Sequence, residues 1–259
     1  MGDLAFVTAE VLSVVDVSDP HSPQLLSFTQ YGAPTYDGTI VDNLAFLART
    51  YHDPPSGLLI VDVSDPALPY EISSCGEWDS TGVAVDSSYA YTAGRDGLHV
   101  VDVSDPALPI PIGFFEAAWS SSYVTRVAVA DGLAVVAPEL EPLHVIDIAE
   151  PHSPAEAAVF EEMHFSPTDV AFERGRVLVS NDGPGILRII DVTAPHAPFE
   201  VGASGLDLHA RGVAVAGDLA YVAATTGGVA IFDVSGCDAI IFRDDFESGD
   251  TTRWPIIVP

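Results

Sequence analysis

Residues 98–109, LHVVDVSDPALP, contain the phrase on which the architecture depends, because variants of it return along the chain. The variants are LSVVDVSDPHSP at 12–23, LLIVDVSDPALP at 58–69, LHVIDIAEPHSP at 143–154, LRIIDVTAPHAP at 187–198 and VAIFDVSGC at 229–237. Their matching aspartates, separated by 46, 40, 45, 44 and 42 residues, are Asp16, Asp62, Asp102, Asp147, Asp191 and Asp233. The chain is therefore built from six repeats with a period in the low forties.

One repeat, starting near Thr81, reads as four short strands, A to D, with the sequences GVAVD, YAYTA, GLHVVDVS and IPIGFFE. Runs of β-branched residues separated by turn residues indicate strands, and a period of 40 to 50 residues with several strands per unit is typical of propeller blades. A parallel α/β sheet would need helices between its strands, and only 155–164 has a faint helical pattern. We predict an all-β fold, a six-bladed β-propeller with four-stranded antiparallel blades.

The Ser-Asp-Pro-x-x-Pro phrase predicts a turn after strand C. Proline lacks the N–H that a strand ladder needs, and the residue before it is driven into an extended conformation. We expect Asp102 and its five equivalents to accept hydrogen bonds from backbone N–H groups of this turn. The alternative, six carboxylates that ring a channel as metal ligands, is disfavoured because the outer end of strand C lies far from the axis of a propeller.

The VVDVSDP and IVDVSDP phrases resemble the LVIVD repeat of bacterial and archaeal cell-surface or secreted β-propellers, and the resemblance extends from Leu4 to about Ser235. It implies an extracellular or cell-surface location and a role in adhesion or interaction, with no catalytic residues. The later copies depart from the pattern, since Glu150, Ala194 and Gly236 replace the usual acid and the last copy lacks both prolines. Such drift is expected of a terminal blade.

The two ends of the chain differ from the internal repeats. We assign 1–242 to the propeller and 243–259 to an acidic tail, whose sequence is similar to tails of secreted bacterial proteins. The first copy begins at its second strand, LAFVTA at 4–9. We expect the segment 238–242, DAIIF, either to complete the first blade or to form the outer strand of the last one, because an open strand edge promotes aggregation. The alternative is that the chain is a truncated product.

Charge and composition exclude several functional classes. The chain has 9 basic and 38 acidic residues, a formal net charge of −29, and all of its basic residues are Arg. It therefore lacks the basic surface of nucleic-acid-binding proteins and the lysine of phosphate-binding loops and Schiff-base enzymes. No run of 18 apolar residues predicts a membrane span, and no signal peptide is visible at the start. Cys75 and Cys237 are too few for a disulfide framework or a Cys-based zinc site.

The D-to-A and B-to-C connections meet at one end of each blade, which we call the loop end. The B-to-C loops there differ in every copy, and function usually lies on divergent loops of a repeated scaffold. The D-to-A joins lead toward the axial mouth, with Thr81, Thr125 and Thr168 beside our candidate ligand-binding residues, which are Tyr36, Asp37, Arg126, Asp169, His209 and Arg211. These residues suit a polar or anionic small ligand. The alternative is an ordinary ion pair between Arg126 and Asp169.

Motifs for catalysis are absent from the sequence, which has no HExxH, no GxSxG and no two histidines at i and i+4. Carboxylates and a histidine on separate B-to-C loops form a weak candidate for acid–base or metal chemistry: His52, Asp53, Glu139 and Glu141. His99 and His144 share one strand position, which favours packing between blades, and Trp78 and Trp119 are candidates for sugar stacking or buried packing.

We therefore predict an extracellular or cell-surface binding or adhesion propeller whose partner is a protein, a glycan or a small polar ligand. No catalytic residue, no metal ligand, no cofactor, no nucleic-acid partner and no membrane span are expected. The alternative from another class is a propeller hydrolase or lyase with its site, and a divalent cation, at the mouth of the central channel.

Overall fold

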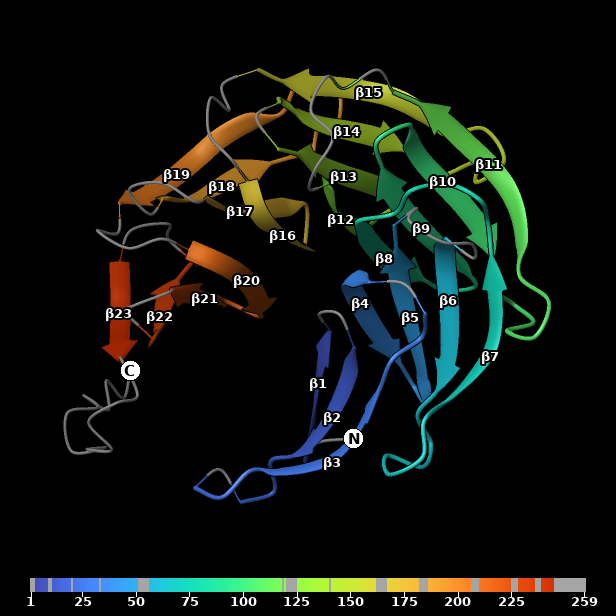
Figure 1. The fold of residues 1–259 in the computed structure, drawn as a ribbon. Helices are drawn as coiled ribbons and strands as arrows, with labels where there is room; N and C mark the ends of the chain where they lie inside the picture. Colours follow the sequence, from blue (N-terminus) through green and yellow to red (C-terminus); the bar gives the residue numbers. More distant parts are fainter. Residues whose placement is uncertain are drawn as a thin grey trace. The chain divides into compact units, whose positions relative to one another are not determined.

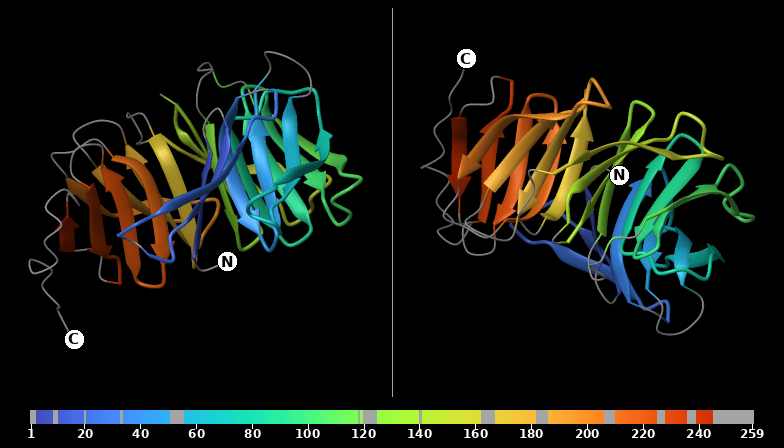
Figure 2. Two further views of the ribbon diagram at one scale, coloured as in Figure 1. Left: turned by 60° about the horizontal axis from the view of Figure 1, so that its bottom comes forward. Right: turned by 90° about the horizontal axis from the view of Figure 1, so that it is seen from above.

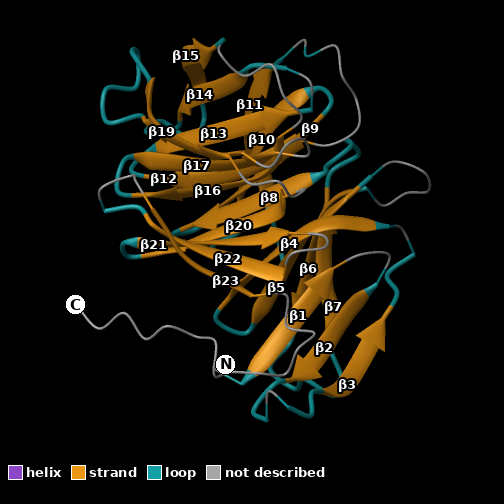
Figure 3. Ribbon diagram, turned by 90° about the vertical axis from the view of Figure 1, so that its left-hand side faces the viewer, coloured by secondary structure: helices purple, strands orange, loops and turns teal. Residues whose placement is uncertain are grey.

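The computed structural model describes residues 3–8, 11–19, 21–32, 34–50, 56–117, 119, 125–139, 141–161, 167–181, 186–205, 210–224, 228–235 and 239–244. Every regular element in these ranges is a strand (Figure 3). None of the described ranges contains a helix that could cross a membrane. By compactness the chain forms two units, one of Met1–Val127 with Glu150–Pro154 and one of Ala128–Ala149 with Ala155–Pro259.

The first unit contains three antiparallel sheets whose strands are hydrogen-bonded in chain order (Figure 1). The first sheet consists of β1 (Leu4–Thr8), β2 (Leu12–Asp16) and β3 (Gln24–Thr29). The second consists of β4 (Thr35–Val41), β5 (Leu44–Arg49), β6 (Gly57–Asp62) and β7 (Tyr70–Cys75). The third consists of β8 (Gly82–Asp86), β9 (Tyr89–Gly94), β10 (Gly97–Asp102) and β11 (Ile110–Glu116).

The remaining three sheets have four strands each, and Figure 2 shows the strands of the last sheet side by side. The fourth sheet consists of β12 (Thr125–Ala130), which begins in the first unit, β13 (Leu133–Pro138), β14 (Leu143–Asp147) and β15 (Ala155–Phe160). The fifth consists of β16 (Pro167–Glu173), β17 (Arg176–Asn181), β18 (Ile186–Asp191) and β19 (Phe199–Gly205). The sixth consists of β20 (Ala210–Ala216), β21 (Leu219–Ala224), β22 (Gly228–Asp233) and β23 (Ala239–Asp244).

This element order confirms the predicted fold class, an all-β, six-bladed β-propeller with antiparallel blades. Five blades have four strands, and the first has three in the described part of the chain. Of the two expectations for the segment near 240, the structure selects the second, because β23 pairs with β22 as the outer strand of the last blade. Within the described residues, β1 pairs only with β2 and is therefore an edge strand of its sheet.

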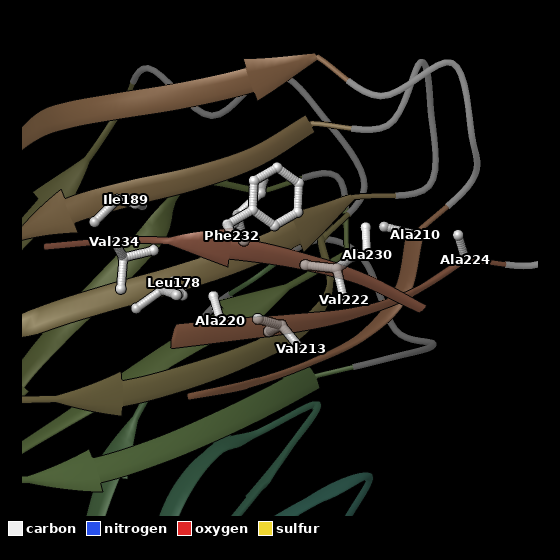
Figure 4. Close-up of a cluster of buried hydrophobic side chains, with 11 residues drawn as sticks. Leu178, Ile189, Ala210, Val213, Ala220, Val222, Ala224, Ala230, Phe232 and Val234 are labelled. Atoms are coloured by element: carbon white, nitrogen blue, oxygen red, sulfur yellow. The ribbon is translucent and has the colours of Figure 1, made fainter. Parts of the chain in front are cut away.

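The cores lie between consecutive sheets of each unit. In the second unit, Leu178 and Ile189 pack with Val222 and Phe232 of the following blade (Figure 4). In the first unit, Ile60 of β6 belongs to a similar cluster with residues of the third sheet. In the second to fifth sheets, successive residues of the second strand are buried, so both faces of these sheets are covered. Their strands A to C are almost continuously apolar, as the sequence predicted.

The aspartate that ends each strand C makes the predicted turn contact in all six copies. Its Oδ1 accepts the backbone N–H of the residue two positions later, at 2.8–2.9 Å, in Asp16, Asp62, Asp102, Asp147, Asp191 and Asp233. In the second copy the Ser64 hydroxyl also donates to Asp62, and these bonds lower the pKa of that carboxyl. The corresponding serines lower the pKa of Asp16, Asp102 and Asp233.

The proline of the same phrase links neighbouring blades within the first unit. Ser27 Oγ in β3 donates to the carbonyl of Pro66 at 2.7 Å, and Ser73 Oγ in β7 donates to the carbonyl of Pro106 at 2.6 Å. At the equivalent position of β11 stands a glycine, and a Cβ added to Gly113 would lie only 2.0 Å from the carbonyl oxygen of Pro151. In these blades the phrase therefore fixes the end opposite the loops, which we call the turn end.

Candidate functional site

A β-bulge interrupts the start of the innermost strand at the loop end of three blades. The register shifts between Thr35 and Asp37 in β4, between Pro167 and Asp169 in β16, and between Ala210 and Gly212 in β20. One residue of each strand is thereby left out of the ladder, and we call these the bulge residues: Tyr36, Thr168 and Arg211. A bulge bends its strand and redirects the side chain at that point.

The aspartates after two of these bulges bind backbone N–H groups. Asp37 accepts the N–H of Gly38 at 2.9 Å and that of Val83, in the next blade, at 3.0 Å. Asp169 accepts the N–H of Val170 at 2.9 Å and that of Val213, also in the next blade, at 2.9 Å. Each carboxylate therefore ties the innermost strand of its blade to that of the following blade.

Arg126 occupies the equivalent position in β12 and holds the backbone by different contacts. Its Nη1 donates to the carbonyl of Tyr36 at 3.2 Å and to that of Thr81 at 3.0 Å. Sequence reasoning placed Arg126 at the site but missed this structural contribution, because the carbonyls that it binds belong to residues 90 and 45 positions away. The alternative ion pair with Asp169 stays a prediction.

The bulge residues differ in exposure and in chemistry. The Tyr36 side chain is 43% exposed, and Arg211 is also exposed. Thr168 is half-buried, and its Oγ1 donates to the carbonyl of Ala210 at 3.0 Å and lies 2.9 Å from Ser180 Oγ. His209, the remaining candidate, lies outside the described residues. Of the candidate residues that the structure describes, Tyr36 and Arg211 are exposed, and Asp37, Arg126 and Asp169 are half-buried.

The aromatic and histidine candidates are packing residues. His99 stacks between Trp78, at 4.1 Å, and Phe114, at 4.4 Å, with its Nε2 3.0 Å from Asp96. His144 contacts Glu156 through Nδ1 at 2.9 Å. Trp119 is 7% exposed and donates to the carbonyl of Gly94 at 2.7 Å. Buried packing therefore describes Trp119, whereas Trp78 is half-buried and packs against His99.

The metal and thiol candidates lie only partly in the described part of the chain. Within those ranges, no three His, Cys, Asp or Glu side chains gather so as to hold a metal ion. His52, Asp53 and Cys237 lie outside them. Burial raises the pKa of the Cys75 thiol, which keeps it in the less reactive protonated form.

A pocket of about 310 Å³ lies at the turn end of the second unit, where the sequence suggested no site. Its polar wall includes Arg174, whose guanidinium lies 3.4 Å from both Glu173 and Asp218. Arg176 Nη1 donates to the carbonyl of Val234 at 2.8 Å. Arg174 occupies the left-handed turn position that Asp42, Ser87 and Asp131 hold in other blades, and this exchange is the sequence signal for the pocket. The Arg174 cation is already compensated by carboxylates.

The LVIVD repeat model matches residues 1–29, 53–76, 79–116, 122–161 and 209–238, which is more than half of the chain. The chain belongs to the LVIVD-repeat family. Among curated proteins, none matches it significantly.

Solved structures with the same fold are distant in sequence. A functionally unknown protein from Desulfotomaculum acetoxidans DSM 771 superposes with a TM-score of 0.70 at 13% identity, over 92% of this chain and 80% of that one. The computationally designed protein Ika8 superposes with a TM-score of 0.68 at 13% identity, over 92% of this chain and 70% of that one. A chain of a nidogen/laminin complex superposes with a TM-score of 0.64 at 10% identity, over 93% of this LVIVD-repeat chain and 92% of that one. At these identities the likeness shows the fold alone.

Proposed function

We propose that this LVIVD-repeat propeller is a binding or adhesion module that recognises a protein, a glycan or a small polar ligand through the loop ends of its blades. The observation that carries the proposal is the bulge at the start of the innermost strand. In three blades it takes one residue out of the ladder, and that residue is Tyr36 in one copy, Thr168 in another and Arg211 in a third.

The chemistry of the two exposed bulge residues, Tyr36 and Arg211, supports recognition. An exposed tyrosine offers a rigid apolar ring with a polar tip, and an exposed arginine offers a fork of donors for carboxylates and hydroxyls. The residue after the bulge meanwhile keeps the backbone in place, through Asp37 and Asp169. A fixed backbone that presents a varied side chain is the arrangement that binding surfaces need.

The location proposed for the protein is extracellular or at the cell surface. Support comes from its membership of the LVIVD-repeat family and from its net charge of −29, which favours solubility without a basic surface. Immunodetection should find the protein in the medium or on intact source cells. Detection only inside the cells would contradict this location.

The binding experiment begins with a screen of the whole chain against immobilised glycans, metabolites and surface proteins. For a ligand found in this way, Tyr36→Ala or Arg211→Ala should weaken binding at least tenfold, about 1.4 kcal/mol. The matched controls are Tyr70→Ala and Arg174→Ala, which change an exposed tyrosine and an exposed arginine at the turn end. Unchanged affinity in both bulge variants would refute the proposal.

A hydrolase or lyase remains the alternative class, and no contact among the described residues favours it. Acid–base or metal chemistry requires side chains to converge within about 3 Å of one reacting atom. Asp37 and Asp169 instead bind backbone N–H groups. We propose that no cation is needed, so extensive dialysis against a chelator should leave the melting temperature unchanged, and a large fall would overturn this point.

A further inference from the structure

Arg49, the last residue of β5, is the largest of the fully buried side chains and is 0% exposed. Its Nη1 donates to the carbonyl of Tyr31 at 3.3 Å. Its Nε and Nη2 have no hydrogen-bond partner, and no carboxylate of the described residues lies within 4.0 Å of the guanidinium. Two donor nitrogens of a buried cation are thus unused.

An unused buried guanidinium needs a physical explanation. Burial of an ion costs several kcal/mol unless it is paired and hydrogen-bonded, and native proteins satisfy most buried polar groups. Burial lowers the pKa of Arg49 more than the charge of Glu71 raises it, so Glu71 compensates the cation incompletely. Arginine nevertheless stays protonated in proteins, so the side chain cannot escape the cost by losing its charge.

The two unused nitrogens lie on the same edge of the guanidinium. This edge forms two parallel hydrogen bonds with the oxygens of a carboxylate or a phosphate. The bond from Nη1 to Tyr31 holds the opposite side of the group and so fixes the direction of the free edge. Leu47 and Leu59, both fully buried on the same face of their sheet, lower the local dielectric and strengthen any bond made there.

Three hydroxyls on segments that meet at Arg49 are also buried without a partner: Thr50 Oγ1, Ser56 Oγ and Ser80 Oγ. Thr50 follows Arg49 directly, and Ser56 precedes Gly57, the residue opposite Arg49 in the ladder. The backbone N–H of Ser80 donates to the carbonyl of Arg49 at 3.0 Å. Unused hydrogen-bonding groups from three chain segments are therefore concentrated at the loop end of the second blade.

We propose that Arg49, supported by these hydroxyls, forms a buried binding site for a small oxyanion, the carboxylate or phosphate group of a ligand. The site differs from the exposed bulge residues, and it does not depend on them. The arginines of the pocket at the turn end offer no such site, since Arg174 already contacts two carboxylates and Arg176 binds a carbonyl.

The test measures thermal unfolding of the whole chain in acetate, phosphate and sulfate, titrated at constant ionic strength with chloride as the balancing anion. At least one oxyanion should raise the melting temperature of the wild type by several degrees, with saturation, because a ligand that binds only the folded state stabilises it. The Arg49→Met variant should lose this shift. Arg174→Gln, a change to an exposed arginine, should keep it.

Arg49→Met also separates a binding role from a structural one. In chloride alone the variant should melt at the same temperature as the wild type or higher, because a buried unpaired charge is replaced by an apolar side chain of similar length. If this variant does not fold, Thr50→Val and Ser56→Ala keep the charge and should raise the half-saturating oxyanion concentration several-fold.

A ligand that is retained during purification would mask the titration, so the as-purified protein is also denatured and its released small molecules are analysed by mass spectrometry. A stoichiometric carboxylate or phosphate compound from the wild type, absent from Arg49→Met, supports the proposal. The proposal is overturned if the wild type neither releases such a compound nor shows a saturable shift, or if Arg49→Met retains the full shift.

Discussion

The turn end and the loop end of the blades follow opposite rules. At the turn end, the strand C aspartate makes the same backbone contact in all six copies, and the proline of the phrase meets the previous blade at Ser27, Ser73 and Gly113. At the loop end, equivalent positions hold different residues, such as Asp37 and Arg126, with different partners. The turn ends are therefore held by contacts that recur, whereas the contacts between blades at the loop end differ from copy to copy. The exposed bulge residues Tyr36 and Arg211 are the divergent positions that we assign to recognition.

The largest effect is expected from Gly113→Ala, since the new Cβ would lie 2.0 Å from the carbonyl oxygen of Pro151. The chain must shift to accommodate it, and overpacking of this kind costs about 3 kcal/mol. Gly212→Ala is the control, because its Cβ would meet only contacts of 3.6 Å or more. Urea unfolding should separate the two variants, and equal stabilities would contradict the close approach at the turn end.

Asp37→Ala should follow, with a loss of about 2 kcal/mol in unfolding free energy. It removes a carboxylate that binds two N–H groups and leaves the Val83 donor in the next blade without this acceptor. Tyr36→Ala, one residue earlier, changes an exposed side chain and should stay within about 0.5 kcal/mol of the wild type. If Tyr36→Ala proves more destabilising than Asp37→Ala, then the assignment of a structural role to Asp37 and of a binding role to Tyr36 is wrong.

Ser73→Ala removes the hydroxyl that binds the carbonyl of Pro106, and we expect a loss of about 1 kcal/mol. The neighbouring Ser74→Ala serves as the control, because the Ser74 hydroxyl makes no hydrogen bond in the part of the chain that the structure describes. A double-mutant comparison with Ser27→Ala should give additive losses, since the two contacts involve different pairs of blades. If Ser73→Ala lowers the unfolding free energy no more than Ser74→Ala does, the hydrogen bond from Ser73 to Pro106 does not stabilise the fold.

The smallest effect concerns acid. The pKa values of Asp16, Asp62, Asp102 and Asp233 are lowered in the folded chain by hydrogen bonds from the following serines. Their contribution to stability is therefore complete above the unfolded pKa, about 4, and is lost as the pH falls through the lower folded values. Melting curves from pH 6 to pH 2 should show wild type and Asp62→Asn converging toward low pH. A difference that is constant with pH would argue against these bonds.

The architecture could be predicted from the repeat because its turn residues and its apolar strands depend on interactions close in the sequence or on burial. The Asp102 contact depends on residues two positions apart, and the apolar strands follow from burial on both faces. The choice of β23 as the outer strand of the last blade could not be predicted, since both sheets offered an edge to the same apolar segment.

The candidate site was predicted only in part, for a reason that Arg126 and Arg49 illustrate. Both are isolated arginines in a chain that has only 9 basic residues, and their local sequence does not indicate which backbone carbonyls they bind. Arg126 binds Tyr36 and Thr81 across the fold, and Arg49 is buried at the end of a strand whose neighbours are apolar. Contacts of this kind between distant segments produce no repeating pattern in the sequence, so only the structure reveals them.

The fourth copy of the turn phrase, Glu150–Pro154, is grouped with the first unit, although the residues on either side of it belong to the second. The chain thus passes between the units three times, and no single cut separates them. A fragment that ends at Val127 would lack the turn that covers Gly113, and limited proteolysis at one site should not release an independently folded half. Attempts to express half of this protein should therefore carry residues through Pro154.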